Sequence, residues 1–332
     1  MSTRTLRQVT VTAPKTVQLL AHPLADAEPG PGEIAGPTLA TVVSAGTELA
    51  AFYCAQGDRF PGHPGYAAVF EVERTGEGVD DFQPGDRAFA MGRHQSFQRC
   101  AAMEALPVPD GLCPPAAACA RLAGISLTTF VTTTARPPEI ALVTGLGPVG
   151  NFAAQAFRVG AYRVIGVDPD ARRRDMASAC GVTDVRERVP TDDPAVAGNV
   201  GVVAECSGHE QAVLDGLSVV RKRGEVVLIG VPWQRRTDRW AHDVLDKVFH
   251  DYAVLRSGWE WELPRHEEDF RPASIFNNFR MALDWIADGR MLVEDLIEIN
   301  RPAEAPAVYR ALHAGTADKL VQAFDWSQEE SP

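Results

Sequence analysis

Residues 139–150, with the sequence EIALVTGLGPVG, decide the fold of this chain. An apolar run suited to a buried parallel strand ends in a G-x-G-x-x-G turn, and apolar residues then recur at helical spacing from Val149 to Phe157. The first glycine permits a tight turn, the second lets a ligand approach the backbone, and the third lets the helix pack on the strand. The stretch therefore predicts a strand, a phosphate-binding turn and a helix, as in a dinucleotide-binding fold.

A second β-prone run, residues 163–168 with the sequence RVIGVD, follows this helix and ends on Asp168. A carboxylate there can accept hydrogen bonds from both ribose hydroxyls and would repel a 2′-phosphate, so NAD is predicted in preference to NADP. Three consecutive arginines, Arg172, Arg173 and Arg174, keep NADP open, because a nearby guanidinium can hold a 2′-phosphate. The same arginines are equally typical of a solvated helix start.

Length and charge restrict the classes of partner. A chain of 332 residues is long enough for two domains with sizeable cores, and 32 basic against 44 acidic residues give a net charge of −12. Nucleic acid and anionic membranes are therefore not expected as partners. No apolar run approaches a membrane span and the N-terminus lacks the apolar core of a signal peptide, so we expect a cytoplasmic protein. Its six scattered cysteines predict reduced, mostly buried thiols.

The pattern changes once along the chain. Residues 9–109 are dense in glycine and proline with short β-prone runs between turns, which indicates an irregular, barrel-like β domain. From about residue 116 helical and β-prone segments alternate, which predicts an α/β doubly wound parallel sheet. Its strands are expected at residues 140–143, 164–167, 200–205 and 225–229, with a later helix around 279–286, a β-like run at 319–326 and a frayed tail at 328–332.

Several motifs, in this order, resemble those of the medium-chain dehydrogenase/reductase superfamily over nearly the whole chain. Residues 76–87 (GEGVDDFQPGDR) are similar to the family's VGxGVxxFxxGDRV turn, residues 107–112 (PVPDGL) to its LPDGL, and residues 223–232 (RGEVVLIGVP) to its GGxVVLVGxP. The resemblance implies a Rossmann cofactor domain over 124–269 and a GroES-like irregular β-barrel catalytic domain formed by 1–123 and 270–332. It also implies a homodimer.

The chain departs from the zinc-dependent members of that superfamily at each expected ligand of the catalytic metal. Residues 45–48 read AGTE where those members have CGTD, residues 65–67 read GYA where they have GHE, and the third ligand position falls near Ala123. Alanine offers zinc no lone pair and a phenol is a poor substitute for imidazole, so no metal is expected. The four cysteines of the structural-zinc lobe are missing too. Residues 44–48 and 64–66 resemble a zinc-free branch that includes bacteriochlorophyllide dehydrogenase-like proteins.

Without zinc, a side chain must take the hydroxyl proton of the substrate. Thr47 matches the hydroxyl that relays this proton in zinc-dependent members, and Glu48 could raise its basicity or act itself. Tyr66 replaces the metal's histidine, so its phenol is expected to point at the reacting carbon. His63 and His94 are further candidates for this proton-accepting role. The alternative is that Glu48 is a structural ion-pair partner and that Tyr66 only fills the vacated metal space.

The resemblance also assigns cofactor contacts along the chain. They are Gly145, Leu146, Gly147, Pro148, Val149 and Gly150 in the phosphate turn, Asp168 and Arg173 at the adenosine ribose, Ser207 and Gly208 at the sheet edge, Val231 and Trp259 near the nicotinamide carboxamide, and Lys319 at the pyrophosphate. Trp259 and Trp261 flank Glu260 near that region, and they either pack in a core or a dimer interface or form a stacking platform for a ring-shaped substrate.

Taken with the residues, the resemblance implies a zinc-independent, NAD-dependent oxidoreductase. Its substrate would be a small secondary alcohol or ketone, such as a sugar, a cyclitol or another natural-product intermediate. Two alternatives stay open. One is an NAD(P)H-dependent ene or quinone reductase, against which Asp168 argues; the other is a non-catalytic NAD-binding protein.

Overall fold

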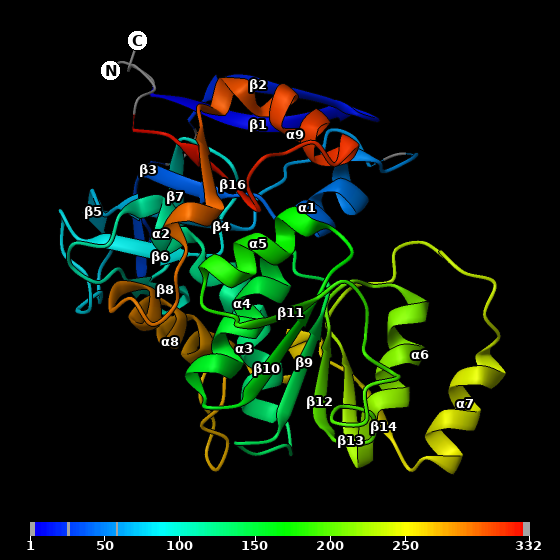
Figure 1. Ribbon diagram of the computed structural model, residues 1–332. Coiled ribbons are helices and arrows are strands. Elements are labelled where there is room, and N and C mark those ends of the chain that lie inside the picture. Colours follow the sequence, from blue (N-terminus) through cyan, green and yellow to red (C-terminus); the bar gives the residue numbers. More distant parts are fainter. Residues whose placement is uncertain (1–3, 25–26, 58, 328–332) are drawn as a thin grey trace. The chain divides into compact units, whose positions relative to one another are not determined.

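The computed structural model describes residues 4–24, 27–57 and 59–327, and it divides into two compact units (Figure 1). Unit 1 comprises Met1–Arg121 and Val293–Pro332, and unit 2 comprises Leu122–Leu292. The chain thus leaves unit 1, completes unit 2 and returns to unit 1.

Unit 2 is built on a six-stranded sheet in the order β11-β10-β9-β12-β13-β14, in which every neighbouring pair is parallel. The chain starts in the middle at β9, winds outward to β11, and then restarts beside β9 with β12, so the strand order reverses between β9 and β12. In such sheets ligands bind beyond the carboxyl ends of the strands at this switch point. The strands are β9 (Ile140–Thr144), β10 (Arg163–Val167), β11 (Asp184–Arg186), β12 (Val200–Glu205), β13 (Val220–Leu228) and β14 (Val254–Ser257).

Helices cover both faces of this sheet, because parallel strands joined by helical crossovers are buried on both sides. All residues of β9 are buried. One core contains Ala153 and Phe157 of α4, and the other contains Leu217 of α6. The predicted doubly wound sheet is therefore confirmed, although β13 begins at Val220, five residues before the expected 225. The helices are α3 (Ala120–Thr132), α4 (Pro148–Val159), α5 (Ala171–Ala179), α6 (Glu210–Val219), α7 (Ala241–His250) and α8 (Ile275–Ala287).

Helix α8 lies where the sequence predicted a helix, but it belongs to unit 2 and not to the catalytic part expected from residue 270 onward. The reason is its packing. Trp285 meets Phe130 of α3 edge-on at 5.7 Å between ring centroids, and Phe279 lies so close to Gly124 that a Cβ there would be 2.4 Å from its ring. The sequence pattern predicted the helix, but it did not predict the surface on which the helix packs.

Unit 1 is a β structure built around the long strand β3 (Glu33–Val42). An eight-stranded sheet has the path β15-β16-β3-β4-β6-β8, while β5 and β7 also pair with β3 and a hairpin of β1 and β2 stands apart. Pairs within the sheet are antiparallel except β15 with β16. The remaining strands are β1 (Thr5–Ala13), β2 (Thr16–Pro23), β4 (Ala67–Glu71), β5 (Arg74–Thr75), β6 (Arg87–Ala90), β7 (Phe97–Ala101), β8 (Ala105–Pro107), β15 (Ile297–Asn300) and β16 (Val321–Asp325).

Two registers in unit 1 bring distant parts of the sequence together. Val42 at the end of β3 pairs with Ala67, so the residue before β4 lies beside the turn that follows β3. Ala323 of the returning strand β16 pairs with the same Val42 on the other side. The helices of unit 1 are α1 (Ala45–Glu48), the π-helix Leu49–Tyr53, α2 (Pro114–Ala118) and α9 (Ala305–Ala314).

Three smaller expectations have mixed outcomes. Cys119 and Cys180 are buried, Cys54, Cys100 and Cys206 are half-buried as residues, and Cys113 is exposed. Burial raises the pKa of the Cys100 and Cys206 thiols, so four of the six thiols are enclosed, in line with the expectation. The tail 328–332 lies outside the described residues. Within the described part of the chain, no helix is both long and apolar enough to cross a membrane.

Candidate active site

The glycine turn of unit 2 joins β9 to α4, and its glycines have different packing roles. Gly145 has φ of +80° and lies so close to the next loop that a Cβ would be 2.8 Å from Cα of Ser207. A Cβ on Gly150 would lie 1.8 Å from the Gly145 carbonyl oxygen. A Cβ on Gly147, the N-cap of α4, would meet nothing within 4 Å. The turn is therefore tightly packed at Gly145 and Gly150, and it leaves open space at Gly147, where the N-terminus of α4 attracts anions.

Asp168 follows β10 directly and points back to this turn. Its Oδ2 accepts a hydrogen bond from the Leu146 amide at 2.8 Å, and its Oδ1 accepts one from the Asp170 amide at 2.9 Å. The residue is only 2% exposed. The sequence pattern predicted a carboxylate facing a ribose, whereas the structure gives Asp168 a second role in fixing the turn. Leu146 correspondingly has a buried side chain and an amide committed to Asp168.

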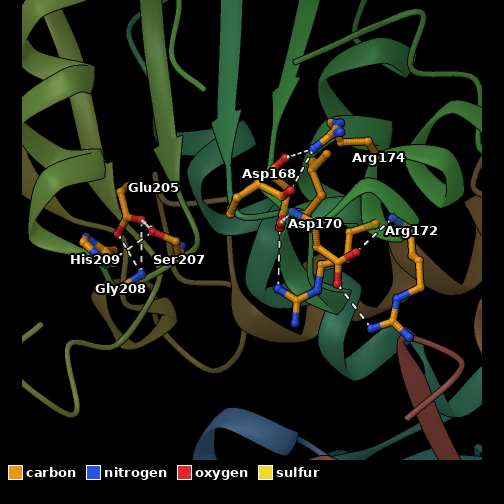
Figure 2. A network of polar contacts seen from close by, with 11 residues as sticks. Asp168, Asp170, Arg172, Arg174, Glu205, Ser207, Gly208 and His209 are labelled. Carbon is orange, nitrogen blue, oxygen red and sulfur yellow. Dashed lines mark hydrogen bonds and ion pairs between the residues drawn. The ribbon is translucent and has the colours of Figure 1, made fainter. Parts of the chain in front are cut away.

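The three arginines that left NADP open all have partners around the start of α5 (Figure 2). Arg172 bonds to the N-cap Asp170 through its amide at 2.9 Å, and its guanidinium lies 3.4 Å from the same carboxylate. Arg173 Nη1 lies 3.5 Å from Asp168 Oδ2, and Arg174 donates to the Asp168 carbonyl at 2.7 Å. The positive charges of Arg172 and Arg173 are thus partly neutralised by the carboxylates of Asp170 and Asp168.

A buried carboxylate that the sequence pattern did not single out organises the neighbouring loop. Glu205 ends β12, and it accepts hydrogen bonds from the Ser207 amide at 2.7 Å, from the Ser207 hydroxyl and from the Gly208 amide at 3.1 Å (Figure 2). Burial raises the pKa of Glu205 above its ordinary value. A glutamate closing the apolar run Val200–Glu205 was the available signal, because a charge at the end of a buried strand needs a local set of donors.

The structure places part of the predicted nicotinamide region beside this loop. A Cβ on Gly208 would lie 2.7 Å from the Val231 carbonyl, so the segments after β12 and β13 touch. Trp259 follows β14, donates its amide to Ser257 Oγ at 3.1 Å and leaves 65% of its surface exposed. Ser207, Gly208 and Val231 thus come together at the carboxyl edge of the sheet, and Trp259 is on its surface and not in a core.

In unit 1, the predicted catalytic residues lie on α1 and on the segment before β4. Thr47 is half-buried in α1, while Glu48 beside it is only 1% exposed. Glu48 accepts a hydrogen bond from the Ser44 amide at 2.9 Å and one from the Tyr309 hydroxyl, and it lies 3.1 Å from Nε2 of His94. Burial and the neighbouring Glu48 carboxylate raise the pKa of Tyr309 well above its ordinary value.

The same network continues through His94 to the returning strand. His94 Nδ1 lies 2.8 Å from the Thr41 hydroxyl, which also accepts from Trp326 Nε1 at 3.0 Å. The His94 ring meets Phe324 edge-on at 5.1 Å. Because three groups from α1, α9 and the loop before β7 surround its carboxylate, Glu48 fits the structural interpretation better than that of a general base.

Tyr66 has a different environment. It is half-buried before β4, and the guanidinium of Arg121 lies over its ring at 4.1 Å from the centroid. Arg121, near the start of α3, is 2% exposed. Sequence reasoning missed Arg121, and the only available signal was a cation two residues before Ala123, the expected third metal position.

Two other predicted residues have ordinary local contacts in unit 1. His63 Nδ1 lies 3.4 Å from the Thr10 hydroxyl, and burial together with Arg93 lowers the pKa of His63. Lys319 donates to the Asp295 carbonyl at 2.6 Å. Their predicted roles at the substrate and the pyrophosphate stay predictions.

The residues at the positions that the resemblance assigns to the catalytic zinc have the following surroundings. Ala45 and Ala123 carry no donor atom, and the ring of Tyr66 is covered by a cation. Among the described residues, histidine, cysteine, aspartate and glutamate form no group of three that could hold a metal.

Residues 148–260 match the family described as Zinc-binding dehydrogenase. The chain is 34% identical over 123 residues to alcohol dehydrogenase class-P of Arabidopsis thaliana, covering 34% of this chain and 32% of that protein. It is 23% identical over 230 residues to sorbitol dehydrogenase of Bacillus subtilis, covering 58% of this chain and 65% of that protein. The matches therefore span less than two thirds of either relative.

The fold likeness extends over the whole chain. Acetophenone reductase from Geotrichum candidum, solved in complex with NAD, superposes with a TM-score of 0.80 at 17% identity, covering 98% of each chain. Such low identity establishes the fold alone. Residues 148–260 are thus similar in sequence to zinc-binding dehydrogenases, and the whole chain is similar in fold to acetophenone reductase.

Proposed function

We propose that this protein is a zinc-independent, NAD-dependent oxidoreductase that transfers a hydride between a secondary alcohol or ketone and the nicotinamide ring. The observation that carries the proposal is the glycine turn, which is closed behind Gly147 and open in front of it at the N-terminus of α4. A pyrophosphate needs such a space, free amide hydrogens and a helix dipole. A turn that served only to connect β9 and α4 would not require an open glycine.

The residues around the turn fit a dinucleotide. The amides at the start of α4 would hold the pyrophosphate, and Asp168 and Arg173, which lie 3.5 Å apart, would meet the adenosine ribose. Ser207, Gly208 and Val231 would lie along the nicotinamide half. When bound, the cofactor supplies the hydride acceptor or donor, and the chain supplies position and charge.

NAD is favoured over NADP because the carboxylates of Asp168 and Asp170 would repel a 2′-phosphate bound near the start of α5. Asp168 and Asp170 partly neutralise the nearby arginines, so an added phosphate would have to displace existing pairs.

The proton path rests on Thr47 and Tyr66, which the pairing of Val42 with Ala67 brings to neighbouring segments. Absence of donor atoms at Ala45 and Ala123 supports zinc-independent chemistry, as in the zinc-free branch that the sequence resembles. The substrate is proposed to be a sugar, cyclitol or other natural-product alcohol, in keeping with the name of the sorbitol dehydrogenase relative.

The test combines binding, turnover and metal content. NADH and NADPH are titrated by fluorescence, a panel of secondary alcohols and ketones is screened with both cofactors, and Tyr66→Phe and Thr47→Ala are compared with wild type. We expect NADH to bind more tightly than NADPH, and each substitution to slow turnover without weakening NADH binding.

Other outcomes would contradict parts of the proposal. Equal affinities for NADH and NADPH contradict the ribose argument, and reduction of conjugated C=C bonds alone would make the protein an ene reductase. Near-stoichiometric zinc in chelator-free protein would overturn zinc independence, and NADH binding with no turnover would indicate a binding protein.

A further inference from the structure

We propose that Arg121 is a positioning residue for proton transfer, because its buried guanidinium stabilises the ionised form of the Tyr66 phenol. The use of this phenolate in catalysis rests on the proposed function, whereas its formation does not. It is carried by the stacking of Arg121 on Tyr66 in unit 1.

The geometry favours the negative form of the ring. The Arg121 carbon Cζ lies 4.1 Å from the ring centroid of Tyr66. A cation over an aromatic face is attracted by the electron density of that face, and ionisation of the hydroxyl adds negative charge to the ring. The attraction is therefore stronger for the phenolate than for the phenol, which favours loss of the proton.

Burial makes this attraction matter. Arg121 is 2% exposed, and a guanidinium keeps its charge under all ordinary conditions. Charges that water cannot screen interact more strongly than surface charges. The stack also fixes the plane of the ring, so that the hydroxyl has a defined direction.

The packing around both residues explains why they meet. Helix α2 packs on β3 and β4, and α3 starts directly after α2 with Arg121 in its first turn. Tyr66 immediately precedes β4. The contact is thus set by the docking of α2 on the sheet and not by proximity in sequence.

Three other charged or titratable groups of unit 1 have different neighbours. Glu48 and His94 face each other and the Tyr309 hydroxyl. Arg93 lies against Gly65, where a Cβ would be 2.3 Å from its Cα, and it acts on the pKa of His63. Arg121 is the cation that the structure places over the Tyr66 ring itself.

The proposed step is balanced. In alcohol oxidation, the substrate O–H bond breaks and its proton forms the O–H bond of Tyr66, while the C–H electron pair leaves as hydride to the nicotinamide. In ketone reduction the phenol returns that proton to the new alkoxide. Arg121 exchanges no proton or electron; it sets how readily Tyr66 holds its proton.

The decisive measurement is the ionisation of Tyr66, which needs no substrate. The chain has five tyrosines. Ultraviolet difference titration of wild type against Tyr66→Phe isolates the phenol of Tyr66, and burial raises the pKa of Tyr162 and Tyr309 above their ordinary value. We expect Tyr66 to titrate below the ordinary pKa of about 10. A value at or above that figure overturns the proposal, whatever the enzyme assay gives.

Variants at Arg121 supply the second readout. Arg121→Met keeps a long side chain without charge and should raise the pKa of Tyr66 by about one unit, whereas Arg121→Lys should restore part of the difference. The alkaline-rising limb of kcat/KM should move by the same amount. Far-UV circular dichroism checks folding. If the Tyr66 titration moves and no alcohol turns over, the proposed function fails and this inference stands. An unchanged titration in folded Arg121→Met contradicts the inference alone.

Discussion

Asp168 in the glycine turn of unit 2 and Glu48 in the network of unit 1 are both buried carboxylates that need hydrogen-bond donors. Asp168 finds its donors nearby in the sequence, and Glu48 finds most of its donors far away. In the turn, Asp168 bonds to the amides of Leu146 and Asp170, all within one strand-helix-strand segment. In the network, Glu48 draws its partners from His94 and Tyr309, far away in sequence. A local arrangement can be recognised as a motif, whereas a distributed one is defined only by the fold.

The largest effect is expected from adding a side chain within the glycine turn. Gly150→Val should abolish NADH binding, because even its Cβ would lie 1.8 Å from the Gly145 carbonyl. We expect at least a 100-fold loss of affinity, about 2.7 kcal/mol, with destabilisation of unit 2. The control is Gly147→Ala, whose Cβ meets nothing within 4 Å, so the fold should survive while NADH binding weakens. Fluorescence titration and circular dichroism measure both. Full NADH affinity in Gly147→Ala would place the pyrophosphate elsewhere.

Loss of Glu48 tests whether the distributed network is structural. Glu48→Leu should destabilise the protein by about 3–5 kcal/mol, because it leaves His94, Tyr309 and the Ser44 amide without their buried acceptor. Urea denaturation measures the free energy of unfolding. Glu48→Gln, which keeps an acceptor oxygen, should cost less. A Glu48→Gln protein of normal stability that has lost turnover would instead favour the catalytic interpretation.

Asp168 sharpens the comparison, because it serves both the turn and the proposed ribose site. Asp168→Ala should reduce the preference for NADH over NADPH by about tenfold, or 1.4 kcal/mol, since the repelling charge is gone. It should also loosen the turn by removing the acceptor of the Leu146 amide. Paired titrations with both cofactors give the preference. If NADH and NADPH weaken equally, Asp168 acts only on the turn.

The smallest expected effect concerns the pH dependence of Glu205. Burial raises its pKa, so the folded state binds this proton more tightly than the unfolded state does. The resulting stability is complete below the unfolded value, about pH 4.3, and is lost as the pH rises through the raised folded pKa.

Glu205→Gln cannot ionise but keeps an acceptor for the Ser207 and Gly208 amides. The unfolding free energy of Glu205→Gln should therefore increase relative to that of wild type as the pH rises above about 4.3. The increase should be about 1.4 kcal/mol for each unit by which the pKa of Glu205 differs between the folded and unfolded states. Urea titrations from acid to neutral pH measure the difference. A difference that does not change with pH would mean that Glu205 ionises equally in both states.

The strands on either side of the glycine turn were predictable because each signal lies within a short stretch of sequence. Buried parallel strands are continuous apolar runs, and the turn has a fixed glycine spacing. Strands were expected on this basis at residues 140–143 and 200–205, and β9 and β12 lie there. The membership of α8 in unit 2 was not, since the Phe279 and Trp285 contacts depend on which helix faces which.

The sequence by itself determined the glycine turn, the carboxylate after β10 and the missing donors at Ala45 and Ala123, because covalent spacing and side-chain chemistry suffice for each. Only the tertiary structure decided that Glu48 is enclosed by His94 and Tyr309 and that Arg121 covers Tyr66. Those contacts join segments far apart in the chain, and strand register and helix docking, which no local pattern encodes, bring them together.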